Sequence, residues 1–321
     1  MADFDVCVVG EINLDLILYG LPKELVLDRE LLASRLAVTL GSSSAIFAHN
    51  LAMLGSNVGF FGKIGGDTLG KMALERLAAA GVDVSRVKRA TERTTGLTVV
   101  LPYLRQRYIL TFPGTMFELE YSDIDMGRMR AARHLHVSSF FLHRALRKRI
   151  VDLFRQAKEA GLTTSLDTND DPENKWDRDL LEVLKHVDIF LPNDREAKKI
   201  AHTEDLSQAI NLLAGLAKVV VVKRGSSAAI CRSGQQQYSL MPPSVKPVDD
   251  VGAGDSFDAG FIHKFTAGAS LEDCLAFANL AGAYSTTKEG GTEAFRDRIA
   301  LTSFMRQHGE TVGRGMPPLK G

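Results

Sequence analysis

The chain has 321 residues, of which 45% are hydrophobic and 24% charged, and these values are ordinary for a globular protein of one large or two average domains. Lysine plus arginine equals aspartate plus glutamate at 39 each, so the sequence lacks the basic excess that nucleic acids or membrane surfaces attract. We therefore expect a protein that acts on a small molecule, with no nucleic-acid partner and no membrane partner.

Strand-like and helix-like segments alternate along most of the chain. Short apolar runs rich in β-branched residues predict strands at Phe4 to Val9, Val58 to Phe61, Leu135 to Val137, Leu162 to Leu166, Val187 to Leu191 and Val219 to Val222. Helical periodicity between them predicts helices at Leu69 to Ala80, Leu146 to Ala160 and Leu180 to Lys185. This alternation is typical of an α/β fold with a central, mostly parallel sheet flanked by helices.

The segment from Thr94 to Gly114 departs from the alternation, because two strand-like runs surround a polar tip at Arg105 and Gln106 without a helix between them. We expect a hairpin there, either a small β lid over a site or an ordinary edge hairpin. The segment from Gly309 onward is rich in Gly and Pro and lacks periodicity. We therefore expect one domain, residues 1–309, with a small appendage and a disordered tail at 310–321.

The cysteines and the N-terminus indicate where the protein works. Cys7, Cys231 and Cys274 are widely separated and lack the spacing of a disulfide framework or a zinc site. The first residues contain no basic leader, and no apolar run approaches the ~20 residues of a membrane-spanning helix. We expect a cytoplasmic protein.

The sequence VDDVGAGDSFDAGF, residues 248–261, places two glycines before an apolar pattern, which is typical of a backbone anion cradle at a helix N-terminus. Asp255 follows at once, and its carboxylate would repel a bound phosphate. The conflict disappears if the amides of Gly252, Ala253 and Gly254 stabilise a phosphoryl group in transfer while Asp255 takes the proton of the attacking hydroxyl. The alternative is that Asp255 only caps the helix.

Two other phosphate-binding patterns fit less well. GGDTLGKM, residues 65–72, nearly matches a P-loop, but Met72 stands where a hydroxyl must bind Mg²⁺. The glycines before Asp255 also suggest a dinucleotide fingerprint, but Phe257 occupies the place of its third small residue. A Rossmann dehydrogenase is therefore disfavoured.

Polar residues also follow two of the predicted strands. Asn193 and Glu196 are three residues apart after the strand that ends at Leu191, so they share a helix face, and their oxygens suit hydrated Mg²⁺. A capping box is the alternative for this pair. Lys223 ends the next strand, and ligand crevices in open α/β sheets lie at such strand ends. The alternative there is a plain β-turn at Gly225-Ser226.

Near the N-terminus, Asn13 and Asp15 lie two residues apart in an otherwise apolar alternation, so they share one face of an extended segment. An amide beside a carboxylate can bind adjacent hydroxyls of a sugar. The alternative is that both are solvated loop residues.

The chain resembles the ribokinase-like carbohydrate kinases of the PfkB family over essentially its whole length, to about Gly309. DDVGAGDSFDAGF is similar to the family's C-terminal signature D-T-x-G-A-G-D, PNDRE to its N-x-x-E magnesium motif and KRGSSAA to its nucleotide-binding K-x-G turn. GEINLD is similar to the sugar-binding start of the fold, and LDTNDDP to the D-P-N-x-R segment of many sugar kinases. The resemblance implies a kinase that uses ATP and Mg²⁺, with Asp255 as the base and Gly252, Ala253 and Gly254 as the anion hole.

The resemblance also implies the other site residues. Those that would bind the nucleotide are Asn193, Lys223, Gly225, Ser226 and Asn279. Those that would bind the acceptor are Asn13, Asp15, Gly41, Ser42, Arg107 and Asn169. Those that would bind metal are Glu196, Asn193 and Asp249, with Asp249 beside a monovalent cation such as K⁺. The lid would comprise residues 12–40 and 92–116, and we expect a homodimer formed through it.

Three positions depart from the family pattern. Ile46 stands where the N-terminal signature carries Asn, Asp171 stands where D-P-N-x-R carries Arg, and Asp250-Val251 replaces Thr-Thr. The first two lie on the acceptor side, so they leave phosphoryl transfer intact and leave the acceptor unidentified. We expect ATP-dependent phosphorylation of a hydroxyl of a sugar or sugar acid. The alternatives are a nucleoside kinase of the same fold and a non-catalytic sugar-binding regulator.

Overall fold

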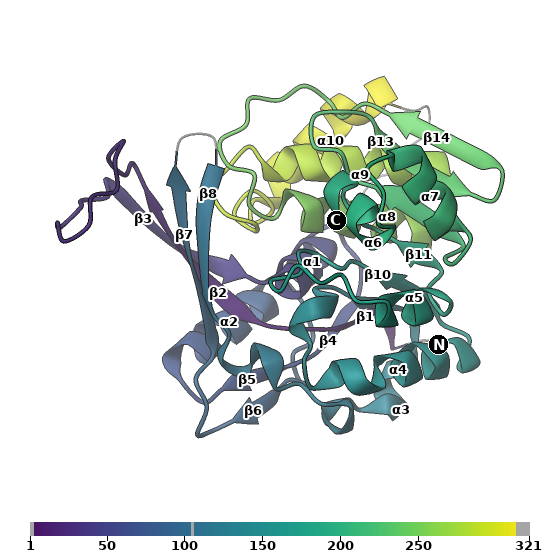
Figure 1. Cartoon of the computed structure of the whole chain (residues 1–321), viewed down its shortest axis with the longest axis horizontal. Coiled ribbons are helices and arrows are strands. Elements are labelled where there is room, and N and C mark those ends of the chain that lie inside the picture. The colour runs from purple at the N-terminus through teal and green to yellow at the C-terminus, as the bar shows by residue number, and fades with distance from the viewer. Residues whose placement is uncertain (1–2, 104–105, 313–321) are drawn as a thin grey trace.

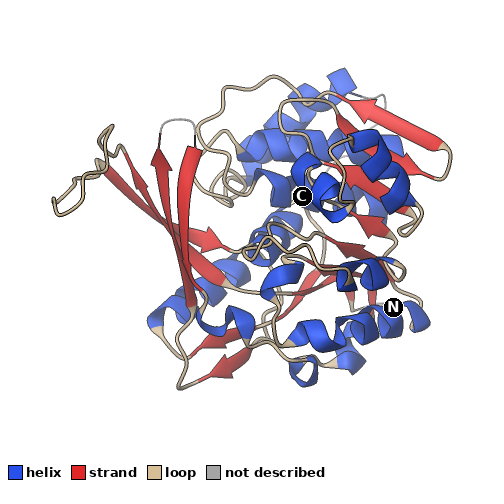
Figure 2. Cartoon of the chain, in the orientation of Figure 1, coloured by secondary structure: helices blue, strands red, loops and turns tan. Residues whose placement is uncertain are grey.

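The computed structural model describes residues 3–103 and 106–312. A large sheet with helices on both sides forms the body, and a separate four-stranded sheet projects from one end of it (Figure 1). Figure 2 shows that the projecting sheet carries no helix beyond its outer end, where only loops extend. Within the described residues no helix is long and apolar enough to span a bilayer.

The strands are β1 Phe4–Val9, β2 Asn13–Tyr19, β3 Arg35–Gly41, β4 Val58–Phe61, β5 Lys63–Gly65, β6 Lys88–Ala90, β7 Gly96–Tyr103, β8 Gln106–Phe112, β9 Ala132–Val137, β10 Thr163–Leu166, β11 Ile189–Phe190, β12 Val219–Val222, β13 Ala229–Ser233 and β14 Gln236–Leu240. The α-helices are α1 Ser43–Met53, α2 Thr68–Ala79, α3 Met126–Met129, α4 Ile150–Glu159, α5 Asp179–Leu184, α6 Asp194–Ile200, α7 Leu206–Ala214, α8 Ala253–Thr266, α9 Leu271–Ser285 and α10 Arg298–Val312. The 3-10 helices are η1 Gly114–Phe117, η2 Tyr121–Asp123, η3 Phe140–Leu142 and η4 Leu146–Arg149.

The large sheet has the order β14-β13-β12-β11-β10-β9-β1-β4, in which the strands from β12 to β4 are parallel and β13 and β14 form an antiparallel hairpin. This confirms the predicted mostly parallel sheet. From β1 the chain goes first to β4 on one side and later to β9 on the other. The carboxyl ends of β1 and β9 therefore flank a topological switch point, where ligand crevices form in open α/β sheets.

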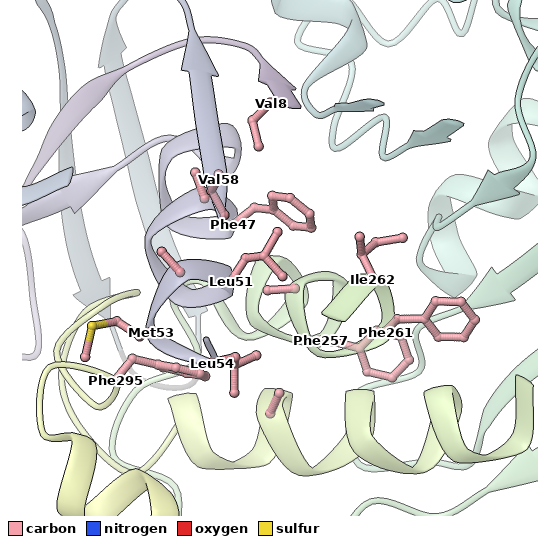
Figure 3. Close-up of a cluster of buried hydrophobic side chains, with 14 of the residues drawn as sticks. Val8, Phe47, Leu51, Met53, Leu54, Val58, Phe257, Phe261, Ile262 and Phe295 are labelled. Atoms are coloured by element: carbon pink, nitrogen blue, oxygen red, sulfur yellow. The ribbon is translucent and has the colours of Figure 1, made fainter. Parts of the chain in front are cut away.

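Both faces of the sheet are buried, so its strands are apolar on both sides. Val6 and Val8 of β1 face a core that includes α1, α2, α8, α9 and α10, whereas Cys7 and Val9 face a second core that includes α4, α5, α6 and α7. Figure 3 shows the first core, in which side chains of α1 meet side chains of α8. The labelled residues are Val8, Phe47, Leu51, Met53, Leu54, Val58, Phe257, Phe261, Ile262 and Phe295.

Helix α8 is also held tightly by α9. A Cβ atom on Gly260 would lie 2.7 Å from the Cβ of Ala281, a distance that real side chains do not tolerate. Gly260 therefore lets the two helix backbones approach closely, and the N-terminus of α8 is placed at the carboxyl edge of the sheet by packing along its whole length.

The four-stranded sheet, which we call the lid sheet, has the order β3-β2-β7-β8. Strands β7 and β8 form the hairpin predicted at residues 94–114, although Arg105 of its tip lies outside the described residues. Four apolar side chains join the lid sheet to the loop in front of α8, namely Ile17, Tyr19, Val100 and Val251. We call this group the lid cluster.

The C-terminal part of the chain differs from the prediction. Helix α10 continues to Val312, so residues 310–312 of the predicted disordered tail are helical. Leu301 and Met305 are buried, and Phe304 lies against Tyr284 with ring centroids 4.9 Å apart, which anchors the helix. Residues 313–321 of the predicted tail lie outside the described residues.

A chain of hydrogen bonds runs inside the sheet between β9 and β10. His134 bonds to the hydroxyls of Thr163 and Ser165, and His136 bonds to those of Ser165 and Ser138, each at 2.7 Å. Both imidazoles are fully buried. Burial lowers the pKa of His134 to about 3 and holds that of His136 well below 6.5, so both are neutral in the folded chain.

We predict that these two histidines make the fold acid-sensitive. In the unfolded chain they take up protons near pH 6.5, so their contribution is full above that pH and is lost as the pH falls toward the folded pKa values. At pH 5 the loss is about 2 kcal/mol for each histidine. Urea unfolding at pH 8, 6 and 5 measures it. His134→Gln should flatten this slope and His186→Gln should not, whereas equal slopes in all three proteins would contradict the prediction.

Candidate active site

The loop after β1 and the segment after β9 meet through two buried side chains, Glu11 and His143. A carboxylate oxygen of Glu11 lies 3.4 Å from Nε2 of His143, and the hydroxyl of Ser44 donates to the same oxygen at 2.6 Å. Burial opposes the charge of Glu11, but hydrogen bonds from His143, Ser44 and Ser139 outweigh it and lower the pKa of Glu11 to about 2. Glu11 therefore ties β1, α1 and the end of β9 together beneath the site.

The segment predicted to form the anion cradle, Gly252 to Gly254, lies at the N-terminus of α8. Gly252 precedes the helix with φ 71°, and a Cβ there would lie 2.6 Å from the Cα of Gly291, so this position requires glycine. No side chain caps the helix, so the first-turn amide of Gly254 has no side-chain partner, whereas the amide of Ala253 donates to the carbonyl of Asp250 at 3.2 Å. Because the helix dipole adds positive potential at that end, a phosphoryl group fits this cradle.

Asp255 lies in the first turn of α8 and is only 8% exposed. Burial raises its pKa to about 7 with help from the charge of Asp167, while Lys223 and a hydrogen bond from Ser43 oppose the rise. A carboxylate with a pKa near neutrality can take and release a proton at physiological pH. The position and the pKa are those that a general base needs.

Asn13 and Asp15 lie on β2 of the lid sheet, and both are buried. Burial and the charge of Asp255 raise the pKa of Asp15 to about 7, although Arg107 opposes this. The amide of Asn13 donates to the hydroxyl of Thr98 at 2.8 Å, and its Oδ1 has no hydrogen-bond partner. A buried acceptor without a partner is costly, so Oδ1 of Asn13 is suited to a ligand hydroxyl.

Gly41 lies beside this pair on β3. A Cβ on Gly41 would be 2.1 Å from Oδ1 of Asp15 and 2.6 Å from Oδ1 of Asn13. The absence of a side chain therefore leaves the space into which both polar groups point.

The other three predicted acceptor residues already have structural partners. Ser42 caps α1 and donates to the carbonyl of Glu11 at 2.6 Å. The amide of Asn169 donates to the hydroxyl of Ser139 at 3.3 Å. Arg107 of β8 forms an ion pair with Asp250, just before the anion cradle.

Asn193 and Glu196 form a capping box at the start of α6. The side chain of Asn193 accepts from the amide of Glu196 at 2.9 Å, and the carboxylate of Glu196 accepts from the amide of Asn193 at 2.9 Å. The capping alternative is thus realised. Glu196 is nevertheless buried, and burial together with the charge of Asp167 raises its pKa to about 7. Such a carboxylate is stabilised by a nearby cation.

No group of three or more Asp, Glu, His or Cys side chains that could hold a metal occurs in the part of the chain that the structure describes. Mg²⁺ that carries nucleotide phosphates needs only one or two carboxylates and several waters. Glu196 therefore fits such an ion as a single carboxylate beside the phosphates.

The predicted nucleotide residues are in three different environments. Lys223 is buried between Asp167 and Asp258 at 2.9 Å from each carboxylate. Gly225, with φ 56°, and Ser226 form an exposed turn after β12. Asn279 of α9 donates to the carbonyl of Leu240 at 2.9 Å.

Asp249 is bonded to the lid sheet and to the loop before α10. Its Oδ2 accepts from the hydroxyl of Tyr19 at 2.7 Å and from the amide of Gly290 at 3.0 Å, and its Oδ1 accepts from the amide of Val251 at 3.1 Å. The structure thus gives Asp249 a clear role in holding the lid sheet against the catalytic loop.

Our sequence interpretation missed three polar residues in this site: Glu11, His143 and Asp258. The spacing of Asp258 from Asp255 carried a signal, because residues three apart share a helix face. Glu11 and His143 are 132 positions apart and lie in segments without a shared pattern, so only the fold reveals their contact.

A mostly parallel sheet with a separate four-stranded lid sheet at one end is the ribokinase fold. The structure of Arabidopsis thaliana ribokinase complexed with ribose and ATP superposes with a TM-score of 0.81 and 27% identity, over 95% of this chain and 99% of that chain. Residues 3–298 match the model of the pfkB family carbohydrate kinases. The chain belongs to this family, so it is an ATP-dependent sugar kinase.

Two relatives are similar to most of the chain. An uncharacterized sugar kinase of Archaeoglobus fulgidus is 29% identical over 248 residues, which cover 76% of this chain and 96% of the relative. An ATP-dependent ribose-1-phosphate kinase of Halopiger xanaduensis is 31% identical over 261 residues, which cover 79% of this chain and 82% of the relative.

We predict that Glu196→Gln raises the Mg²⁺ concentration for half-maximal rate by roughly 10- to 100-fold, because it removes the carboxylate beside the metal. Glutamine still serves in a capping box, so the melting temperature should change little. Rate against Mg²⁺ at saturating ATP is the measurement. Asp205→Asn, at the cap of α7, is the control and should leave the curve in place. If the dependence of rate on Mg²⁺ concentration is unchanged in Glu196→Gln, then Asn193 and Glu196 serve only as a capping box.

Proposed function

We propose that this kinase transfers the γ-phosphoryl group of ATP to a hydroxyl of a sugar or sugar acid, with Asp255 as general base. The observation that carries the proposal is the pairing of Asp255, at the anion cradle, with Asp15 of the lid sheet. Their charges interact across the crevice, and each is buried with a pKa raised to about 7. An acceptor hydroxyl between them lies next to both a proton acceptor and a phosphoryl site.

The residues divide the work by position. Asp15 and Asn13 hold hydroxyls of the acceptor, and Asp255 removes the proton of the hydroxyl that attacks. The amides of Gly252, Ala253 and Gly254 stabilise the charge that develops on the transferred group. Glu196 would hold Mg²⁺ that arrives with ATP, and the ion would there neutralise phosphate charge. Closure of the lid sheet over the acceptor excludes water, which would otherwise consume ATP.

A substrate screen tests the proposal. We would measure ADP release from MgATP with D-ribose, ribose 1-phosphate, hexoses, sugar acids and nucleosides. Ribose 1-phosphate is included because one relative is a kinase of that compound. Turnover of a sugar or sugar acid well above that of nucleosides supports the proposal. Preferred turnover of a nucleoside would establish the nucleoside-kinase alternative, and binding without any turnover would establish the regulator.

The homodimer through the lid sheet is also a proposal. The edge strand β8 exposes Tyr108, Ile109, Leu110 and Phe112, each by more than half of its surface. An apolar edge strand is covered most simply by a second copy of itself. Light scattering during gel filtration should give twice the chain mass. Leu110→Lys should give a monomer and Leu27→Lys, on a loop, should not. A monomeric parent protein would contradict the proposal.

Two further parts of the proposal concern environment. We place the protein in the cytoplasm, where its free, buried cysteines Cys7, Cys231 and Cys274 would stay reduced. We place a monovalent cation beside the anion cradle, because the carboxylate of Asp249 accepts three hydrogen bonds and retains a lone pair. Replacing K⁺ by a bulky ammonium salt at constant ionic strength should lower the rate, and an unchanged rate would remove the cation from the proposal.

A further inference from the structure

Lys223 lies at the end of β12 with its ammonium group beneath the first turn of α8. Its Nζ is 2.9 Å from Oδ2 of Asp167, at the end of β10, and 2.9 Å from Oδ2 of Asp258, on α8. The lysine side chain is 11% exposed and the two carboxylates are 1% exposed. One cation thus bridges the acceptor side of the sheet and the catalytic helix.

The same side chain packs against the anion cradle. The space where a Cβ of Gly254 would stand is 3.7 Å from Nζ of Lys223 and 3.8 Å from its Cδ and Cε. Lys223 therefore supports the backbone whose amides form the cradle. It also opposes the negative charge of the surrounding carboxylates of Asp255, Asp258 and Glu196.

These contacts are unfavourable for direct binding of a nucleotide phosphate. To reach a phosphate, the ammonium group would have to leave two buried carboxylates, and each would then remain as an uncompensated buried charge. The attraction of Asp167 and Asp258 outweighs burial and raises the pKa of Lys223, so the ammonium stays charged where it is.

We propose that Lys223 is a positioning residue for the general base: its ammonium, clamped between Asp167 and Asp258, holds the first turn of α8 and the Asp255 carboxylate that this turn carries. This inference rests on the proposed role of Asp255, and it replaces the nucleotide-binding role that the K-x-G resemblance implied for Lys223. The clamp joins three segments that are distant in sequence, so the acceptor side and the catalytic helix keep one spacing.

The charges that face Asp255 come from every neighbouring element. Asp167 follows β10, Glu11 follows β1 and Asp15 lies on β2, and all three carry or can carry negative charge. Ser43 of α1 donates a hydrogen bond, and Lys223 supplies the positive charge. Loss of Lys223 should therefore favour the protonated form of Asp255.

The test uses Lys223→Met with three measurements that need no acceptor. A ¹³C NMR titration of protein labelled at aspartate carboxyls, with Asp255→Asn to assign the signal, should show the pKa of Asp255 raised by about one unit or more. Calorimetry with the Mg²⁺ complex of a non-hydrolysable ATP analogue should show a Kd within about threefold of the parent value. Hydrogen exchange should rise in residues 253–257 and stay constant in α9.

Three variants complete the design. Lys223→Arg keeps a cation and should restore the pKa of Asp255. Lys218 is exposed and comes directly before β12, so Lys218→Met should leave the pKa of Asp255, the Kd and the hydrogen exchange unchanged. Asp258→Asn serves if Lys223→Met does not fold, since it removes only the bond to α8 and should raise exchange in residues 253–257. A Kd weakened by tenfold or more with an unchanged pKa of Asp255 would overturn the proposal and return Lys223 to the nucleotide. None of the three readouts depends on turnover, so failure of Asp255 as the base would be seen separately, in Asp255→Asn.

Discussion

Asp255→Asn is expected to lower kcat by roughly 10²- to 10⁴-fold, the usual contribution of a positioned general base, while the Kd of MgATP changes by less than about threefold. In the proposed site the carboxylate faces the acceptor and the cradle amides are backbone groups, so the substitution removes the proton acceptor without removing the anion hole. Single-turnover rates with the acceptor found in the screen measure the effect. Asp273→Asn, in the first turn of α9, is the matched control and should keep full activity.

The wild-type pH profile gives an independent check of the same residue. Because Asp255 must be ionised to accept a proton and its pKa is raised to about 7, kcat/KM should fall about tenfold per pH unit below 7 and level off above it. Near wild-type turnover by Asp255→Asn, with a flat profile from pH 5 to 8, would show that Asp255 is not the general base.

Asp15→Ala is expected to raise KM for the acceptor by about 10- to 100-fold or more while KM for ATP stays nearly constant. Asp15 and Oδ1 of Asn13 are buried beside the space at Gly41, and leaving each group unpaired costs about 1–3 kcal/mol. Deoxy analogues of the acceptor should be discriminated against by a similar factor, since they leave the same groups without hydroxyls.

Thr98→Val is a useful companion variant, because it removes only the hydroxyl to which the amide of Asn13 donates. It should loosen Asn13 and raise KM for the acceptor less than Asp15→Ala does. Equal use of the acceptor and its deoxy analogues, with Asp15→Ala unaffected, would move the acceptor site away from β2.

The body of the fold could be predicted from local patterns where the patterns are strong. The strands β1, β4 and β12 have the predicted bounds because both of their faces are buried, which requires continuous apolar runs. Helix α1 was not predicted as a helix, and the physical reason is its burial. Every residue of α1 after Ser43 is buried, so the segment has no polar face and no helical periodicity. The hairpin β13–β14 was missed because its strands mix polar and apolar residues.

In the candidate site, too, some features can be predicted from local sequence patterns and others cannot. A motif that would act through its own backbone, such as Gly252 to Gly254, can be recognised in the sequence because all of its groups lie within a few residues. The environment of Lys223 cannot be predicted from the sequence, because its partners Asp167 and Asp258 lie 56 and 35 positions away along the chain. Asn193 and Glu196 show a third situation, in which the same spacing serves a capping box and a metal site. For such a pair only a measurement on the variant separates the two roles.

The lid cluster has a consequence for the timing of turnover. Ile17, Tyr19 and Val100 of the lid sheet pack on Val251, and the hydroxyl of Tyr19 bonds to Asp249, so the lid sheet is attached to the loop that leads into the catalytic helix. Swinging the sheet away exposes these aliphatic and aromatic surfaces to water, at a cost of a few kcal/mol. That cost is paid whether or not a ligand is bound. The residence time of a phosphorylated product is then governed by the four apolar side chains of the lid cluster. Shortening Val100 to alanine would speed product release without touching the reacting groups.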